Sequence, residues 1–268
     1  MKTLRVATLN IWNRFGPWEQ RLAAIRAGIE SLAPDLIGLQ EVLRLDPGEG
    51  DGLDQSEVVA RPFGYHVAYG RAREGRYYGN AALSRWPIRR TRVFELPHGG
   101  TDERRTLLLA EVDSPYGTIP FFVTHLNWKF DEGHVREAQV KEVAKHVDSI
   151  ADPRDFPAIL VGDFNAEPDA DEIRFLRGLT SLGTERRVYF QDAFFAAGDG
   201  TPGFTFARRN PFAAPLCEPD RRIDYVFVRG RDERCRGEAL EARVCFDGPV
   251  EGSFASDHFG VVATLRAE

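Results

Sequence analysis

The feature that most constrains the fold is a short apolar run that stops abruptly in a polar loop. Residues 159–161 have the composition of a buried strand, and Gly162 ends the run. Asp163 and Asn165 follow with one residue between them, and Pro168 cannot continue a central strand. Side chains two residues apart in an extended chain point the same way. The pattern predicts a carboxylate and an amide together at a strand end, which suits metal-assisted attack of water on a phosphate. An ordinary Asx turn would contain the same residues.

Two further stretches indicate how the strands are paired. The first forty residues predict a βαβ unit, which implies parallel pairing. The unit consists of a strand at residues 4–11, a helix at Trp18–Leu32 and a short strand at 36–39. The apolar runs 106–112 and 119–126 flank the turn sequence at 114–117, and we expect them to form an antiparallel hairpin. The sheets should therefore be mixed. Further strands are expected at 65–69, 80–83, 89–96, 223–228, 244–246 and 259–265, and further helices at 133–150 and 171–179.

Size and composition limit the possible classes of protein. The 268 residues carry no repeat and no break in composition, so we predict one domain over residues 1–268. No apolar run approaches the roughly 20 residues of a membrane span, and no signal peptide is visible. Cys217, Cys235 and Cys245 have no metal-ligand spacing and are expected to be reduced thiols of a cytoplasmic protein. The net charge of −6 argues against a protein that coats nucleic acid but does not exclude a nuclease.

Polar residues recur at the ends of the other expected strands. Because ends of neighbouring strands converge, such residues can line one cleft. Oxygen ligands without thiolates favour Mg²⁺ or Mn²⁺ over zinc, and histidines suit proton donation to a phosphate. The residues concerned are Asn10, Glu41, His125, Asp224, Asp257 and His258. Three of them also suit a purely structural role: Asn10 could satisfy a strand terminus, His125 could be a core histidine, and Asp224 could pair with Arg222.

Taken in order, the motifs resemble the endonuclease/exonuclease/phosphatase family of metal-dependent phosphoesterases. The matching segments are Thr8-Leu9-Asn10-Ile11-Trp12, Leu39-Gln40-Glu41-Val42, Gly79-Asn80-Ala81-Ala82-Leu83-Ser84-Arg85, Thr124-His125-Leu126, Gly162-Asp163-Phe164-Asn165, Arg222-Ile223-Asp224-Tyr225 and Ser256-Asp257-His258. The resemblance implies an α/β fold, a four-layer α/β/β/α sandwich of two mixed β-sheets packed face to face with helices outside. It places the active site at one edge of the sheets.

The resemblance also implies roles for individual residues. Glu41 is similar to the principal metal ligand of the family, supported by Asn10 and Asp257. Asp163 resembles the residue that orients or deprotonates the attacking water, and Asn165 the amide that holds this water or a phosphate oxygen. The remaining roles concern charge: His258 and His125 would stabilise the phosphorane, and Asp224 would fix the His258 ring. We therefore expect a hydrogen bond between Asp224 and His258 and a raised pKa for that histidine.

The expected function is hydrolysis of a phosphodiester by a Mg²⁺- or Mn²⁺-dependent enzyme, and the predicted substrate is a nucleic acid or nucleotide. The alternative substrates are inositol phosphates and phospholipid or sphingolipid headgroups, and a non-catalytic binding module on the same fold is a remote alternative. The sequence contains no apolar surface helix of the kind that binds membranes, so we expect no stable membrane association. The sequence does not specify an oligomeric state.

Substrate selectivity is expected to come from the rim of the site. Residues 69–78 interleave arginines and aromatic rings, as surfaces that bind single-stranded nucleic acid do, although a solvated hairpin turn would have the same pattern. Residues 204–209 form a similar case, and the pair at 104–105 and Arg136 could clamp a phosphate or be solvated charges. The candidate substrate-binding residues are Asn80, Arg105, Arg136, Arg76 and Arg208.

Overall fold

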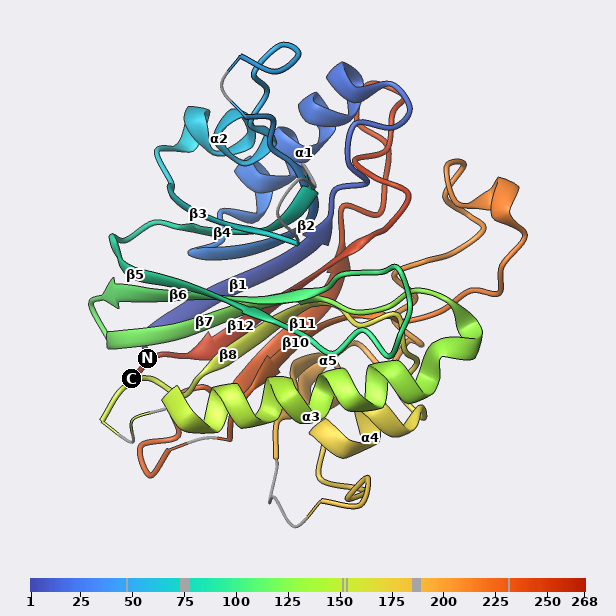
Figure 1. Cartoon of the computed structure of the whole chain (residues 1–268). Coiled ribbons are helices and arrows are strands. Elements are labelled where there is room, and N and C mark those ends of the chain that lie inside the picture. Colours follow the sequence, from blue (N-terminus) through green and yellow to red (C-terminus); the bar gives the residue numbers. More distant parts are fainter. Residues whose placement is uncertain (47, 73–77, 151, 153, 185–188, 231) are drawn as a thin grey trace.

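The computed structural model describes all residues except 47, 73–77, 151, 153, 185–188 and 231. The described residues form two six-stranded sheets that pack face to face (Figure 1). The first sheet has the order β11 (Ala239–Cys245), β12 (Gly260–Arg266), β1 (Thr3–Asn10), β2 (Leu36–Leu43), β4 (Tyr78–Ser84) and β3 (His66–Arg71). The second has the order β5 (Ile88–Glu95), β6 (Thr106–Ser114), β7 (Gly117–His125), β8 (Ile159–Asp163), β10 (Asp224–Val228) and β9 (Gln191–Asp192).

Helices cover the outer faces of both sheets, so the predicted four-layer sandwich is confirmed (Figure 1). The first sheet carries α1 (Trp18–Leu32) and α2 (Gln55–Ala60), and the second carries α3 (Gly133–Ile150) and α4 (Asp171–Leu176). A short helix, α5 (Ala193–Ala197), contributes Ala193 and Phe194 to the core between the sheets. Single-turn 3₁₀ helices lie at Arg61–Phe63, Phe130–Glu132 and Ala214–Leu216.

The two long helices have the predicted bounds because each presents a continuous apolar stripe. In α1, the stripe of Leu22, Ile25 and Ile29 is buried against the first sheet. The helix ends at Ala33, which adopts a left-handed conformation and donates its N–H to the Ile29 carbonyl at 2.8 Å. In α3, the valines 140, 143 and 147 face the second sheet in the same way.

Strand pairing is mixed in both sheets, as predicted. The βαβ unit is confirmed because β1 and β2 pair in parallel with α1 between them. The hairpin is confirmed because β6 and β7 pair antiparallel and are joined at the register Ser114↔Gly117. The helix α3 connects β7 to β8, which also pair in parallel. The carboxyl ends of β1, β2, β7 and β8 therefore lie at one edge of the sandwich.

The core between the sheets consists of the inward side chains of both, for example Val6 and Val261 from the first sheet and Phe121 and Val161 from the second. These side chains are 1% exposed or less. Burial of apolar surface at about 25 cal/mol per Å² is what holds the sheets together. It also fixes the distance between the strand ends on the two sheets.

Several local expectations differ from the structure. The helices α2 and α5 and the strand β9 were not expected, because elements of two to six residues carry little periodicity. The helix α4, which was expected at 171–179, ends already at Leu176. The strand β2 runs to Leu43, beyond the expected end at residue 39. The hairpin tip expected at residues 73–76 lies outside the described residues. The three cysteines are unpaired, and among the described residues no helix is long and apolar enough to cross a membrane.

Candidate active site

Three polar residues stand side by side on adjacent strands of the second sheet. The register pairs His125 on β7 with Asp163 on β8, and Asp163 with Asp224 on β10. The three side chains are 7% exposed or less and come from segments far apart in the sequence, which the sheet brings to one edge. We call these residues the catalytic rung, after the role that the sequence predicts for them.

Close approach of β7 and β8 at the rung depends on Gly162. Its φ is +152°, and a Cβ atom at this position would lie 2.0 Å from the Thr124 carbonyl oxygen. Only glycine avoids this clash. The sequence motif therefore begins with glycine because of the strand packing, and Asp163 is placed by that packing.

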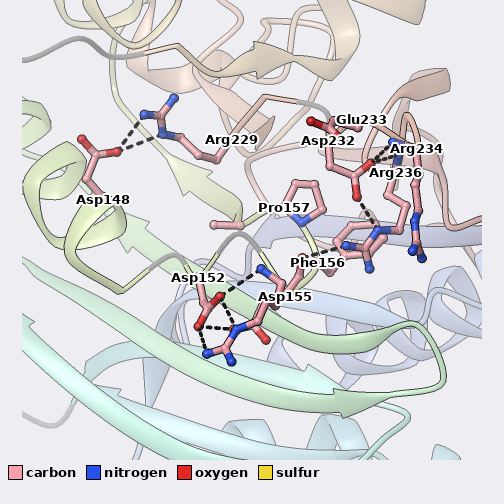
Figure 2. A pocket seen from close by; sticks show the side chains of 12 residues that line it. Asp148, Asp152, Asp155, Phe156, Pro157, Arg229, Asp232, Glu233, Arg234 and Arg236 are labelled. Carbon is pink, nitrogen blue, oxygen red and sulfur yellow. Dashed lines mark hydrogen bonds and ion pairs between the residues drawn. The ribbon is translucent and has the colours of Figure 1, made fainter.

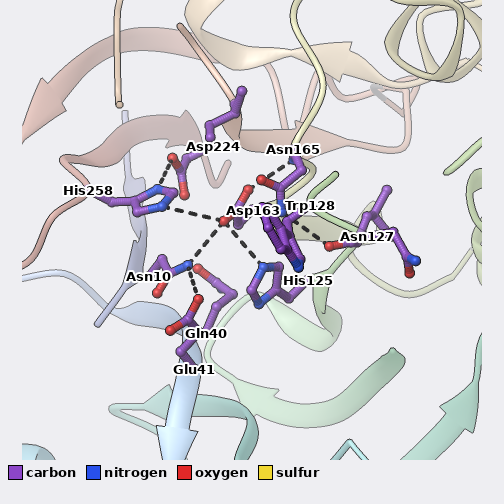
Figure 3. A network of polar contacts seen from close by, with 12 residues as sticks. Asn10, Gln40, Glu41, His125, Asn127, Trp128, Asp163, Asn165, Asp224 and His258 are labelled. Atoms are coloured by element: carbon purple, nitrogen blue, oxygen red, sulfur yellow. Dashed lines mark hydrogen bonds and ion pairs between the residues drawn. The ribbon is translucent and has the colours of Figure 1, made fainter. Parts of the chain in front are cut away.

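Asp163 is the centre of the polar network at the site (Figure 3). Its Oδ1 accepts the backbone N–H of Asn165 at 2.9 Å, and its Oδ2 accepts the side-chain amide of Asn10 at 3.0 Å. The Nε2 atoms of His125 and His258 lie 3.4 and 3.7 Å from Oδ2. Burial raises the pKa of Asp163, and the neighbouring charge of Asp224 raises it further. The carboxylate is thus held in place by donors but is poised to take up a proton.

His258 and Asp224 form the predicted hydrogen bond. The His258 Nδ1 lies 3.0 Å from the Asp224 Oδ2, which confirms the pairing. Burial by itself would lower the pKa of His258, but the carboxylates of Asp224 and Asp163 outweigh it and raise the pKa to about 10. The other oxygen of Asp224, Oδ1, is buried and has no hydrogen-bond partner among the described residues. His258 therefore presents a cationic N–H toward Asp163.

His125 has the opposite electrostatic character. Burial lowers its pKa well below the ordinary value, and the nearby guanidinium of Arg105 lowers it further. Because Arg105 can only donate, the 3.0 Å contact between its Nη1 and the His125 Nδ1 makes Nδ1 the acceptor. The neutral ring then carries its proton on Nε2, on the side of Asp163. The site thus combines one neutral and one cationic imidazole.

Glu41 and Asp257 form an acidic edge on the first sheet. Glu41 lies in an irregularity of the β2–β4 pairing between Leu39 and Val42, and its φ is +56°. Such a bulge redirects a side chain, and here the Asn10 amide donates to the Glu41 Oε1 at 3.2 Å. Burial raises the pKa of Glu41. Burial, together with the nearby negative charge of Glu41, also raises the pKa of Asp257, to about 6. Two carboxylates at one edge supply oxygen ligands that fit a hard divalent ion.

A second group of possible metal ligands lies on the catalytic rung itself. One ligand atom each of Asp163, Asp224 and His258 lies within 4.8 Å of the others, and all three residues are buried. The His258 nitrogens already face these two carboxylates. This group and the acidic edge are neighbouring parts of one site.

Residues 7–258 match the sequence profile of the Endonuclease/Exonuclease/phosphatase family. The chain belongs to this family. The predicted resemblance is confirmed, and the family name covers hydrolases of phosphate esters.

Relatives of this chain are known in sequence and in structure. An uncharacterized protein of Escherichia coli K12, YbhP, is 27% identical over 241 residues, which is 85% of each chain. Exodeoxyribonuclease III of Haemophilus influenzae is 27% identical over 256 residues, covering 82% of this chain and 88% of that protein. The crystal structure of TDP2 from Caenorhabditis elegans superimposes with a TM-score of 0.75 at 20% identity, covering 98% of this chain and 75% of that chain. At that identity the likeness concerns the fold.

One residue that supports this family site was missed from the sequence. Arg21 on α1 is fully buried and donates to the carbonyls of Ile11 at 2.7 Å, Asn13 at 2.9 Å and Ala255 at 3.2 Å. It thereby ties the loop after β1 to the segment that carries Asp257. The available signal was an arginine next to Leu22 on the apolar face of a helix, where charge is rare unless it is partnered.

Two of the predicted substrate-binding residues lie beside the catalytic rung. Asn80 and Arg105 line a small pocket together with His125 and Thr106. The Asn80 side chain donates to the Thr106 carbonyl at 3.0 Å. The buried Arg105 Nε and Thr106 Oγ1 have no partner within the part of the chain that the structure describes. Unpaired buried donors are costly, and the pocket, at about 10 Å³, has room for a single oxygen atom.

The other predicted substrate-binding residues are placed differently. Arg136 is buried, pairs with Glu172 at 2.8 Å and donates to the Lys129 carbonyl at 2.7 Å, so we correct its expected role from phosphate clamp to loop support. Arg208 is exposed beside Asp220. Arg76 lies outside the described residues. Of the expected rim aromatics, Phe206 instead packs inward, edge-on to His258, with ring centres 4.9 Å apart.

A larger hollow of about 1020 Å³ lies elsewhere, beside the amino end of β8 (Figure 2). Its charged side chains are largely paired with one another. Arg229 contacts Asp148 at 2.9 Å, and Arg236 contacts Asp232 at 2.5 Å. The described residues that line it include none of the predicted site residues, so the catalytic rung and the acidic edge are the better candidate for chemistry.

Proposed function

We propose that this chain is a Mg²⁺- or Mn²⁺-dependent phosphodiesterase that cleaves a nucleic-acid or nucleotide phosphodiester by direct attack of water. The observation that carries the proposal is the position of Asp163. Its carboxylate is oriented by Asn10 and Asn165 and lies between a neutral and a cationic histidine. A buried carboxylate with a raised pKa is suited to accept a proton from water near neutral pH.

The acidic edge is the better place for the metal. Glu41 and Asp257 would hold the ion, and Asn10 would support this metal site by donating its amide N–H to Glu41. A bound divalent ion would act as a Lewis acid on a phosphoryl oxygen. We prefer this edge to the Asp163–Asp224–His258 group because a hard cation favours oxygen ligands and because His258 is engaged by Asp224.

The two histidines would stabilise the charge that develops on the phosphoryl oxygens. His258 donates from a cationic ring that Asp224 holds in orientation. His125 donates from a neutral ring whose tautomer is set by Arg105. Fixed donors aimed at developing charge, in a site shielded from water, are among the largest contributions to catalysis. The Arg105 Nε, which is unpartnered among the described residues, would bind a phosphate oxygen in the adjoining pocket.

The choice of a nucleic-acid substrate is supported by similarity to Exodeoxyribonuclease III of Haemophilus influenzae, which aligns over 82% of this chain. The net charge of −6 limits long-range attraction to a polyanion. We therefore expect few phosphate contacts and a shallow dependence of binding on salt concentration.

The proposal is tested by following hydrolysis of single-stranded DNA, RNA, an inositol phosphate and sphingomyelin with and without Mg²⁺ or Mn²⁺. We expect metal-dependent cleavage of the nucleic acids. Asp163→Asn should cost orders of magnitude in turnover while metal binding and folding persist, because an amide cannot accept the proton. Asp192→Asn, which alters a buried carboxylate paired with Arg222, is the matched control. If the enzyme cleaves sphingomyelin or the inositol phosphate faster than the nucleic acids, the assignment of a nucleic-acid substrate is wrong. Absence of hydrolysis of every substrate would favour a binding module.

A further inference from the structure

The loop that follows His125 carries an exposed tryptophan at the mouth of the proposed site. Trp128 exposes 48% of its surface and lies three residues beyond His125, the last residue of β7; Figure 3 shows it among the residues of the polar network. A single exposed aromatic ring is ordinary on a protein surface. What distinguishes Trp128 is how firmly both its backbone and its ring are held.

The backbone on either side of Trp128 is fixed by two buried residues of α3. Gln139 accepts the N–H of Asn127 at 3.2 Å. Arg136 donates to the carbonyls of Asn127 at 3.2 Å and Lys129 at 2.7 Å, while Glu172 holds its Nε at 2.8 Å. The exposed ring therefore projects from a rigid support, and little conformational entropy remains to be lost when a ligand binds it.

The ring of Trp128 is also linked to the catalytic rung. Its indole N–H donates to the Glu103 Oε1 at 3.2 Å, and the Glu103 Oε2 pairs with Arg105 at 3.1 Å. Arg105 in turn donates to His125. Three consecutive contacts thus fix the orientation of the exposed ring relative to the histidine that faces Asp163.

A second exposed ring at the other end of the loop is linked to the other histidine. Phe130 is 59% exposed, and the guanidinium of the buried Arg221 lies 4.5 Å from its ring centre. Arg221 also lies 5.6 Å from the ring of Phe206, which packs on His258. The loop of residues 128–130 therefore presents two exposed rings, one connected to each side of the site.

We propose that Trp128, assisted by Phe130, is a stacking platform for an unpaired nucleobase next to the scissile phosphate of a single-stranded nucleic acid. This inference rests on the phosphodiesterase function proposed above. Aromatic rings bind bases through their flat faces, which are covered in a duplex and available in a single strand. Stacking also supplies affinity that a chain with a net charge of −6 cannot obtain from long-range attraction. Trp128 would then select what is attached to the phosphate, and the rung would act on the phosphate itself.

The first test compares two substrates, a single-stranded dinucleotide and the analogue whose sugars lack bases. The ratio of their kcat/KM values measures base recognition. In Trp128→Ala we expect this ratio to fall between about fivefold and 150-fold, the range for loss of one stacked base. Trp128→Phe, which keeps a flat ring, should retain most of the ratio. The control is Phe195→Ala, which removes a ring that is 68% exposed on α5 and contacts Arg177. An unchanged ratio in Trp128→Ala would show that Trp128 does not stack on a base, and it would not affect the proposed phosphodiesterase function.

The second test measures binding without hydrolysis. A labelled single-stranded oligonucleotide is titrated into Asp163→Asn and into the same variant carrying Trp128→Ala, and anisotropy is recorded. We expect weaker binding of the single strand in the double variant, and we expect Asp163→Asn alone to bind the duplex of the same sequence more weakly than the single strand. If the native chain hydrolyses neither substrate of the first test, the proposed function fails, and this titration alone decides the platform. Equal affinities of the two variants, or preference for duplex, would overturn it.

Discussion

The electrostatic coupling of His258 to Asp224 can be tested by replacing Asp224 with asparagine. The variant keeps the size of the side chain and removes one negative charge 3.0 Å from the His258 Nδ1. Asp224 is the first of the carboxylates that raise the pKa of His258, ahead of Asp163 and Asp257. In Asp224→Asn the burial of the ring is no longer outweighed to the same extent, so the pKa of His258 should fall from about 10 toward or below its ordinary value of 6.5.

The free energy of this interaction follows from how far the pKa of His258 is raised. A pKa raised from 6.5 to about 10 corresponds to at most about 5 kcal/mol favouring the protonated folded state. The folded-state pKa is raised, so this stabilisation is fully present below pH 6.5 and is lost as pH rises through about 10. Asp224→Asn should remove a large part of it. The free energy of unfolding of the variant should therefore depend less on pH between those two values than that of the native chain.

The assay is an NMR titration of the imidazole carbons of the metal-free protein. In the native chain His258 should remain protonated through about pH 9, whereas in Asp224→Asn it should titrate near or below neutrality. His125 provides the contrast, because burial and Arg105, the two largest causes, keep its pKa low. If His258 of the native chain titrates near pH 6.5, or if its pKa is the same in the variant, the electrostatic account of the pair is wrong. With substrate, activity of the variant should decline at a lower pH than that of the native chain.

Two further predictions concern the acidic edge and the strand packing. Glu41→Gln should weaken Mg²⁺ or Mn²⁺ binding because an anionic ligand is lost; calorimetry that shows unchanged affinity would remove Glu41 from the ligand set. Gly162→Ala should destabilise the fold by more than about 1 kcal/mol, since its Cβ would meet the Thr124 carbonyl at 2.0 Å; thermal unfolding measures this, with Gly248→Ala, at an open position, as control.

The elements that could be predicted from the sequence are those whose signal is local and long. The two long helices follow from apolar stripes of four or more turns, and the hairpin of β6 and β7 follows from its turn residues. The convergence of Asn10, Asp163 and His258 followed from a different kind of information, the order of several motifs. Each of those motifs by itself is compatible with an ordinary turn or strand end.

The remaining features depend on tertiary structure that no local pattern encodes. Glu41 reaches Asn10 because β2 bulges and its backbone adopts a positive φ. Arg136 was expected to clamp a phosphate, but it pairs with Glu172 instead. The two residues are 36 positions apart, so the sequence alone does not show that they are within hydrogen-bond distance. Phe206 likewise packs inward against His258, so the rim is assigned from the exposed side chains of residues 128 and 130 instead.

The site is formed by residues of both sheets, and the side-chain amide of Asn10 connects the two parts. The Asn10 Nδ2 donates one hydrogen bond to Glu41 on the first sheet and one to Asp163 on the second. Its Oδ1 accepts the backbone N–H of Trp12 at 3.0 Å, which fixes the amide plane. An aspartate here would offer no donor to either carboxylate and would add a third negative charge between them, with Asp257 close by. Because the Asn10 amide donates to both carboxylates, Glu41 and Asp163 can lie close together without meeting directly. In the function that we propose, Glu41 would then face the metal and Asp163 the attacking water.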